Sequence, residues 1–99
     1  MPHIYKQSAA RQDLIEIWLY SFTAWGESQA DKYLDDLEGI LELLAQQPLI
    51  CHERMDISPP VRIHHYAHHL IVYTIVDDGI NIIRVLHENM DIETRLNDA

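Results

Sequence analysis

Four histidines, His64, His65, His68 and His69, form the densest group of potential metal ligands in this 99-residue chain. A zinc ion needs three or four ligands that converge on one point, often with a cysteine or a carboxylate among them. On strands that flank a turn, neighbouring side chains point to opposite faces, so at most two of these imidazoles converge readily. We therefore expect surface or turn roles for the four histidines, and we predict neither a metal site nor a cofactor.

Cys51 stands next to His52, and an imidazole can activate a thiol for nucleophilic chemistry. The pair lies in a stretch rich in turn-forming residues, and the sequence offers no third group to orient the histidine. The serines lack the strand–turn–helix setting of a nucleophile elbow, and Ser8 is better explained as a helix cap. The single cysteine leaves no disulfide framework within the chain. Hydrolase chemistry is therefore not expected.

The charge balance argues against direct binding to nucleic acid. Sixteen Asp and Glu oppose seven Lys and Arg, so the formal net charge is −9, and the sequence pI is near 5.0. Proteins that bind phosphates usually present a basic face and have a high pI. The apolar runs, such as residues 70–76, are far shorter than the roughly 20 residues of a membrane span. We expect a cytoplasmic protein with an acidic surface that keeps it soluble, and no membrane partner.

Two amphipathic helices are expected to position any site. Ser8 is predicted to cap the first, which ends at Trp25-Gly26, because glycine suits the left-handed turn that closes a helix. The second is predicted from Ser28 to Gln47, and Pro48 stops it. We place Trp18 in the core and expect the helices to pair as an antiparallel hairpin that buries its apolar face. The apolar face of the first helix, at 3.6-residue spacing, consists of Ala10, Leu14, Ile17, Trp18 and Phe22.

Strands are expected at the start of the chain, residues 3–7, and again after an irregular stretch at 49–60. Asp77-Asp78-Gly79 predicts a hairpin turn in which glycine supplies the positive φ. A short last helix, capped by Asp91, completes a single α+β domain over residues 1–99. The predicted order is β-α-α-β-β-β and that helix, with the helical hairpin packed on a small antiparallel sheet. The three later strands, rich in Val, Ile and Tyr, are 61–66, 70–76 and 80–86.

Four segments, in this order and spacing, resemble the ParE branch of the RelE/ParE toxin superfamily. They read ARQDLIEIW from residue 10, WGESQADKYL from residue 25, LIVY from residue 70 and IRVLHENMD from residue 83. None is a catalytic signature, and the resemblance rests on their combination along nearly the whole chain. It implies the toxin of a type II toxin–antitoxin system, which arrests growth when it acts alone.

The resemblance also implies a protein partner, a co-expressed ParD-like antitoxin that neutralises the toxin in a hetero-oligomer. In the family, an antitoxin helix typically occupies a groove beside the helical hairpin, and an extended segment lies against the sheet. An apolar groove and an open sheet edge suit these two modes, and an acidic toxin favours basic residues on its antitoxin. The implied candidate contacts are Leu19, Phe22, Tyr33, Leu37 and Tyr73.

DNA gyrase is the cellular target that the resemblance implies. ParE-like toxins are understood to trap this enzyme with its DNA cut, which takes differential binding to one state of the partner and no catalytic group. Toxicity in the family is attributed to the segment after the last strand. By residue type alone, this segment is a strand end followed by a helix cap. The candidate target contacts are Arg84, His87, Glu88, Met90 and Asp91.

Two other functions stay open. RelE-type toxins cut ribosome-bound mRNA, and Arg62, Arg84 and His87 could stabilise and protonate the reacting phosphate, with Tyr66 or Tyr73 assisting. The acidic composition, with only two lysines, weighs against such an enzyme. A strand arginine paired with a nearby carboxylate is the simpler explanation of Arg84. The third possibility is a degenerate toxin that only binds its antitoxin.

Overall fold

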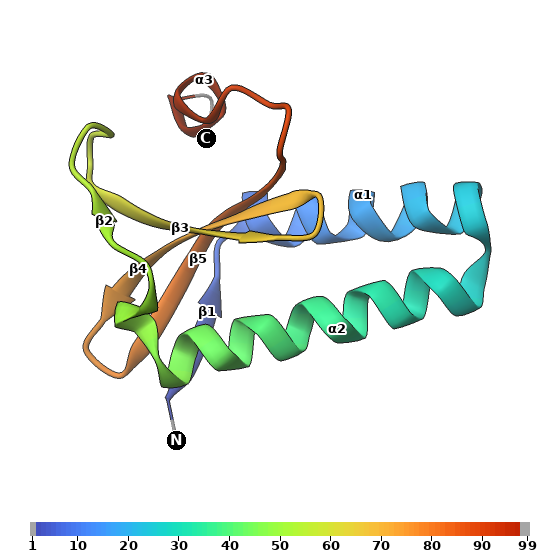
Figure 1. Ribbon diagram of the computed structural model, residues 1–99, viewed down its shortest axis with the longest axis horizontal. Helices are drawn as coiled ribbons and strands as arrows, with labels where there is room; N and C mark the ends of the chain where they lie inside the picture. The colour runs from blue at the N-terminus through green and yellow to red at the C-terminus, as the bar shows by residue number, and fades with distance from the viewer. Residues whose placement is uncertain (1, 98–99) are drawn as a thin grey trace.

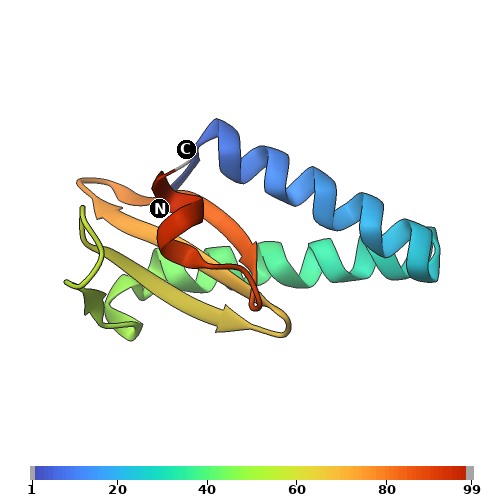
Figure 2. The ribbon, with the colours of Figure 1, turned by 90° about the horizontal axis from the view of Figure 1, so that it is seen from above.

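The computed structural model describes residues 2–97 and follows the predicted element order (Figure 1). A hairpin of two long helices packs on one face of a five-stranded sheet, and a short third helix lies on the other face, as Figure 2 shows from above. No helix in the described part is long and apolar enough to cross a membrane. The elements are β1 (His3–Lys6), α1 (Ser8–Trp25), α2 (Glu27–Gln46), the 3₁₀ turn η1 (Pro48–Ile50), β2 (Glu53–Arg54), β3 (Val61–Tyr66), β4 (His69–Val76), β5 (Gly79–His87) and α3 (Ile92–Asn97).

The predicted helical hairpin is confirmed, and the chain reverses at Gly26. This residue has a φ of 93°, which glycine adopts without a steric penalty, and its N–H donates to the carbonyl of Phe22 at 2.9 Å. Each helix begins one residue earlier than expected. The prediction that Ser8 caps α1 is therefore wrong, because Gln7 holds that position and its carbonyl accepts the first helical bond, from Arg11.

The prediction that Trp18 lies in the core is also wrong. Its ring is only partly buried and stacks on Phe22, with ring centroids 5.1 Å apart, while its indole N–H donates to Asp31 at 2.9 Å. The buried face of α1 is rotated away from Trp18. Two polar residues on that face interrupt the apolar pattern by which the sequence would reveal it. The buried residues of α1 are Ala10, Asp13, Leu14, Ile17 and Ser21.

The sheet has the strand order β1-β5-β4-β3-β2. Strands β2 to β5 pair antiparallel, and β1 pairs parallel with β5, so the sheet is mixed rather than wholly antiparallel. Parallel pairing needs a long crossover connection, which the helical hairpin and the intervening strands provide here. The two-residue strand β2 lies in the stretch that was expected to be irregular. It covers only the first two residues of β3.

Gly79 does not have the predicted positive φ. Glycine is needed at this position for another reason. Val76 pairs with Gly79 across a two-residue turn, so the hairpin itself is confirmed. On its other side Gly79 pairs with His3 of β1. A Cβ at residue 79 would collide with the His3 backbone, so only glycine lets β1 approach β5 this closely.

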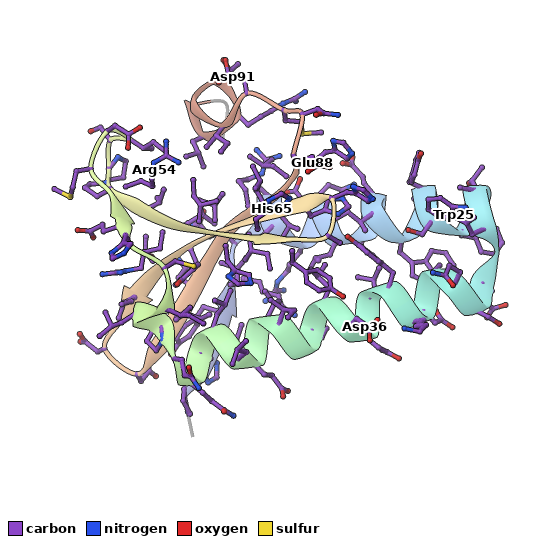
Figure 3. All side chains as sticks on the ribbon, viewed as in Figure 1. Trp25, Asp36, Arg54, His65, Glu88 and Asp91 are labelled. Carbon is purple, nitrogen blue, oxygen red and sulfur yellow. The ribbon has the colours of Figure 1, made fainter. Side chains whose placement is uncertain are left out.

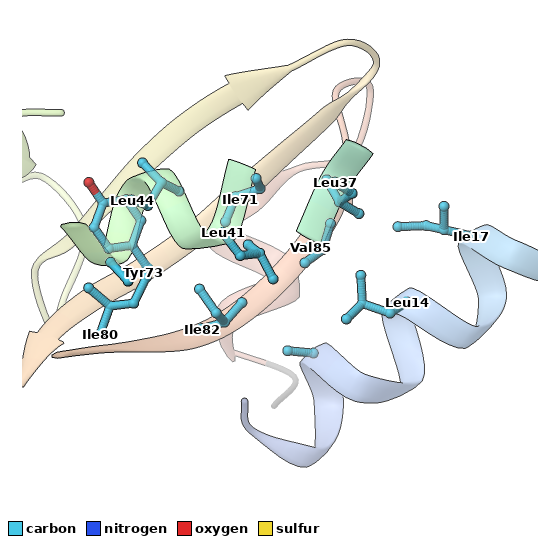
Figure 4. Packing of buried hydrophobic residues seen from close by; sticks show 12 residues of the cluster. Leu14, Ile17, Leu37, Leu41, Leu44, Ile71, Tyr73, Ile80, Ile82 and Val85 are labelled. Atoms are coloured by element: carbon cyan, nitrogen blue, oxygen red, sulfur yellow. The ribbon is translucent and has the colours of Figure 1, made fainter. Parts of the chain in front are cut away.

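The main core lies between the helical hairpin and the sheet (Figure 4). Leu37, Leu41 and Leu44 of α2 are fully buried against the strands. Burying each such side chain contributes roughly 1.5–3 kcal/mol relative to leaving it exposed. The strand residues of this core are Ile71, Tyr73, Ile80, Ile82 and Val85.

A second, smaller core covers the opposite face of the sheet. Ile92 and Leu96 of α3 pack on a cluster centred on Val72 and Leu86. Asp91 precedes α3, its carbonyl accepts the first helical bond from Arg95, and its carboxylate accepts a bond from the Thr94 hydroxyl at 2.9 Å. The predicted short last helix is therefore present.

Candidate functional site

Arg84 of β5 and Asp13 of α1 form a bidentate ion pair. Nε and Nη2 of the arginine donate to the two carboxylate oxygens at 2.8 and 2.9 Å, and the N–H of Val85 donates to the same carboxylate at 2.9 Å. The two side chains are only 15% and 8% exposed. Nη1 of Arg84 also donates to the carbonyl of Arg95 in α3. The pairing of Arg84 with a carboxylate is confirmed, and the pair ties α1, β5 and α3 together.

Glu88, directly after β5, accepts hydrogen bonds from two histidines of the β3–β4 hairpin, of which Figure 3 labels His65. His65 Nε2 and His68 Nδ1 donate to its two oxygens at 3.1 and 2.8 Å. The bond from His68, and then the bond from His65, hold the pKa of Glu88 below its usual range. Two of the four clustered histidines therefore meet on a carboxylate. Among the side chains that the structure describes, no three of His, Cys, Asp or Glu are arranged to hold a metal ion.

His69 lies at the centre of an adjacent aromatic cluster. The hydroxyl of Tyr33 lies 2.6 Å from His69 Nδ1, and the ring of His87 meets the His69 ring edge-on with centroids 5.6 Å apart. Burial, followed by the neighbouring imidazoles of His87 and His68, lowers the pKa of His69 to about 4. The imidazole is therefore neutral at physiological pH, and Nδ1 can accept a hydrogen bond from the Tyr33 hydroxyl.

A groove of about 610 Å³ runs between α1 and the carboxyl end of β5. This volume lies within the range of ligand-binding clefts. Ile17 and Val85 line it with apolar surface, Tyr20 and Trp25 belong to α1, and Met90 belongs to the segment after β5. On the sheet side, the groove is also lined by His68, His69 and His87. It is larger than a second hollow, of about 460 Å³, beside Tyr5 and Asp78.

Comparison with known proteins identifies the family. Residues 4–92 match the family model described as the ParE toxin of the type II toxin–antitoxin system parDE. This chain belongs to the ParE toxin family. Toxin ParE1 of Mycobacterium tuberculosis H37Rv is 34% identical over 89 residues, covering 89% of this chain and 91% of its own length. Toxin ParE1 of Caulobacter vibrioides is 32% identical over 87 residues, covering 88% and 90%.

A solved structure supports the fold. The chromosomal ParDE toxin–antitoxin system from P. aeruginosa contains a chain that superposes with a TM-score of 0.73 at 20% identity. The match covers 88% of this chain and 96% of that one. The fold is thus shared with that chain over most of the described residues.

The candidate target contacts of this ParE-family chain fall into two places. His87, Glu88 and Met90 line the groove together. Arg84 is held in its ion pair with Asp13 and does not line the groove, and Asp91 directly precedes α3. The structure therefore brings three of the five candidates onto one accessible surface.

The candidate antitoxin contacts of the ParE-family chain also divide. Leu19 and Phe22 are 52% and 46% exposed on the outer side of α1, and the half-buried Tyr33 lines the groove. Leu37 and Tyr73 are fully buried in the main core, where the Tyr73 hydroxyl donates to the carbonyl of Pro48 at 2.8 Å. Their side chains offer no surface to a partner, so we no longer include them as contacts.

The structure does not assemble the endonuclease candidates. Arg62 lies on β3 and donates to the Cys51 carbonyl, whereas Arg84 lies on β5 and holds Asp13. One strand separates them, which places their backbones roughly 10 Å apart. Of the three, His87 alone lines the groove. The two guanidinium groups are thus held by different partners at different places.

Sequence reasoning missed the α1 side of the groove, formed by Glu16, Tyr20 and Trp25. Tyr20 and Trp25 are 69% and 65% exposed and meet edge-on, with ring centroids 6.0 Å apart. In the sequence, the positions of Tyr20 and Trp25 relative to the apolar face of α1 could have indicated this side of the groove. Two large aromatics beside that face, rather than on it, indicate a surface kept for contact.

Proposed function

We propose that this chain is a cytoplasmic ParE toxin that arrests growth by binding DNA gyrase, and that a cognate ParD-like antitoxin neutralises it in a hetero-oligomer. The match of residues 4–92 to the parDE toxin family carries the toxin assignment. The P. aeruginosa neighbour is described as a ParDE system, which supports an antitoxin partner.

The geometry favours action by binding over action by catalysis. The groove presents His87, Glu88 and Met90 on a shaped surface, and inhibition of an enzyme in one conformational state requires only such a surface. Arg84, which an endonuclease would need at the phosphate, is engaged by Asp13 and Arg95. Stabilisation of a phosphate transition state requires cations aimed at the reacting group.

Purified toxin added to a gyrase supercoiling and cleavage assay tests the target. We expect inhibited supercoiling and accumulated cleaved DNA, both weakened by Met90→Ala. Met55→Ala is the matched control, because Met55 is also exposed but lies in the loop after β2. Unchanged gyrase activity at excess toxin rejects the gyrase target, and absence of growth arrest on expression alone identifies a degenerate toxin.

The antitoxin contact is tested separately on the outer side of α1. Ile15, Leu19 and Phe22 expose apolar side chains there, and contiguous apolar surface of this kind marks protein interfaces. Leu19→Ala and Phe22→Ala are each expected to weaken antitoxin binding roughly tenfold or more. Leu49→Ala is the control, because Leu49 is 73% exposed in η1. Equal affinities for all three variants would remove this surface from the interface.

A further inference from the structure

The groove between α1 and β5 combines an aromatic wall with an apolar floor. Tyr20 and Trp25 form its α1 rim, and Tyr33 contributes from α2. Ile17 and Met90 supply apolar surface. Methionine is flexible and polarizable, so it adapts to different occupants. Aromatic faces attract cations, most strongly those of tryptophan.

The charge along the groove is negative. Glu16 on α1 and Glu88 after β5 line it, and Asp13 beneath them is compensated by Arg84. Among residues 2–97, no lysine or arginine lines the groove. Hydrogen bonds from His68 and His65 keep the pKa of Glu88 low, so this carboxylate is ionised near neutral pH. The chain as a whole carries a formal charge of −9, which adds to the negative field.

We propose that this groove receives an arginine side chain of a partner polypeptide, carried on a segment whose neighbouring residues are apolar. The inference rests on the proposed function, in which the chain acts by binding proteins. Arginine fits because its planar guanidinium both stacks on aromatic rings and donates in parallel to carboxylates. The ammonium group of lysine is compact and strongly hydrated, and it satisfies only the charge.

The size of the groove favours a polypeptide over a free cation. A volume of about 610 Å³ exceeds what one guanidinium group fills, and the remaining lining includes Ile17, Val85 and Met90. Apolar side chains beside the arginine would cover these residues and exclude water from the charged contact. The guanidinium then lies between the Tyr20–Trp25 pair and the carboxylates.

Short synthetic peptides on the full-length protein test this inference. The probe has nine residues, one central arginine and leucines and alanines on either side. The matched probes replace the arginine with citrulline, which is neutral and of similar shape, or with lysine. Two-dimensional NMR follows the indole N–H signals of both tryptophans, because Trp25 lines the groove whereas Trp18 is bonded to Asp31 outside it.

The arginine peptide is expected to shift the Trp25 indole signal and leave the Trp18 signal in place. Citrulline and lysine peptides should bind at least about fivefold more weakly. Glu16→Gln should reduce the affinity for the arginine peptide about three- to tenfold, whereas Glu42→Gln, an equal charge change on the exposed side of α2, should not. Trp25→Ala should reduce it as well. An unchanged circular dichroism spectrum establishes that each variant is folded.

Three results would overturn the inference. Equal binding of arginine and citrulline peptides would mean a purely apolar groove. Equal binding of free arginine amide would mean a small-molecule site, and a shift at Trp18 alone would place the peptide elsewhere. The gyrase assay keeps the two proposals apart, because gyrase inhibition without peptide binding rejects only the arginine groove. Peptide binding with unaffected gyrase rejects only the gyrase target.

Discussion

Asp13 and Arg84 illustrate how one charged pair can hold a small fold together. Each loses most of its hydration on burial, and the pair compensates for this loss only while both partners and their extra hydrogen bonds are present. Asp13 accepts three such bonds, two from Arg84 and one from the Val85 N–H. Removal of one partner leaves the other buried and uncompensated.

Asp13→Ala is therefore expected to lower the free energy of unfolding by about 3 kcal/mol or more, measured by urea denaturation. Asp56→Ala is the matched control. Asp56 pairs with Arg54 on the surface, with both side chains about half exposed, so this substitution should leave the stability nearly unchanged. Similar losses in the two variants would show that the Asp13–Arg84 pair has no special role.

His69 makes stability depend on pH in a defined direction. Its pKa is about 4 in the folded protein and near the ordinary 6.5 when the chain unfolds. Between these values the unfolded chain binds a proton that the folded protein does not, so stability falls as the pH falls from about 6.5 to 4. Above pH 6.5 both states are neutral at this residue, and its effect on stability no longer changes with pH.

His69→Gln should flatten the dependence of the urea midpoint on pH between 6.5 and 5. His64 keeps part of the slope, because burial also lowers its pKa, and Glu88 acts only at lower pH. In the wild-type protein, an NMR titration should find His69 neutral at pH 5, and a protonated ring at that pH contradicts this account.

At the scale of elements, the contact between β1 and β5 depends on one missing side chain. A Cβ on Gly79 would overlap the backbone of His3, and neither backbone can move without breaking the ladder from His3–Gly79 to Lys6–Ile82. β1 is an edge strand that pairs with β5 and packs against α2, so it is the element that we expect to shift.

Gly79→Ala should lower the free energy of unfolding by about 1–3 kcal/mol and speed hydrogen exchange at the β1 amides. Gly39→Ala is the opposite control. Gly39 lies on the exposed side of α2 with nothing near its absent Cβ, so alanine there should add up to about 1 kcal/mol through helix propensity. Equal effects at the two glycines would contradict the role assigned to Gly79.

The sequence predicted the helices and the β4–β5 hairpin well, because the patterns that indicate them are local. Amphipathic spacing identified α1 and α2, and Asp77-Asp78-Gly79 identified the β4–β5 hairpin. It could not predict that β1 pairs parallel with β5, because that contact joins segments more than 70 residues apart. The buried face of α1 was misplaced for another reason, since the polar Asp13 belongs to it and meets Arg84 only after the sheet has formed.

The candidate site was predicted on its strand side and at Tyr33 of α2, but not on its α1 side. His87, Glu88 and Met90 follow one another closely after β5, so a single segment indicated them. Glu16 and Trp25 reach the same groove from α1, and their approach depends on how the helix rotates against the sheet. The two histidines that meet on Glu88 likewise required the register of β3 against β4.

For the whole molecule, the two faces of the sheet are unequally covered. The helical hairpin packs on one face with eighteen- and twenty-residue helices, whereas the six-residue α3 and Ile57 of the β2–β3 loop pack on the other. Ile92 and Leu96 are the residues of α3 that contact the second core. Both side chains are partly buried, so truncating them together should weaken the second core and leave the main core intact.

The double variant Ile92→Ala/Leu96→Ala should lose about 2–4 kcal/mol of stability and bind the dye ANS, because it exposes the cluster around Val72. Its helical circular dichroism should persist, because α1 and α2 are packed elsewhere. Loss of the helical signal together with the second core would mean that the two layers fold as one inseparable unit.

The pairing of β1 with β5 determines the order in which the elements can form during translation. His3 is translated 76 residues before Gly79, its partner in the ladder. At about 5–20 residues per second, the nascent β1 therefore waits roughly 4–15 seconds, while the helical hairpin can already form from local contacts. The groove needs the residues after β5 and so comes later still. A prematurely terminated translation product would contain the helical hairpin but would lack the groove surface to which we assign the toxin's activity.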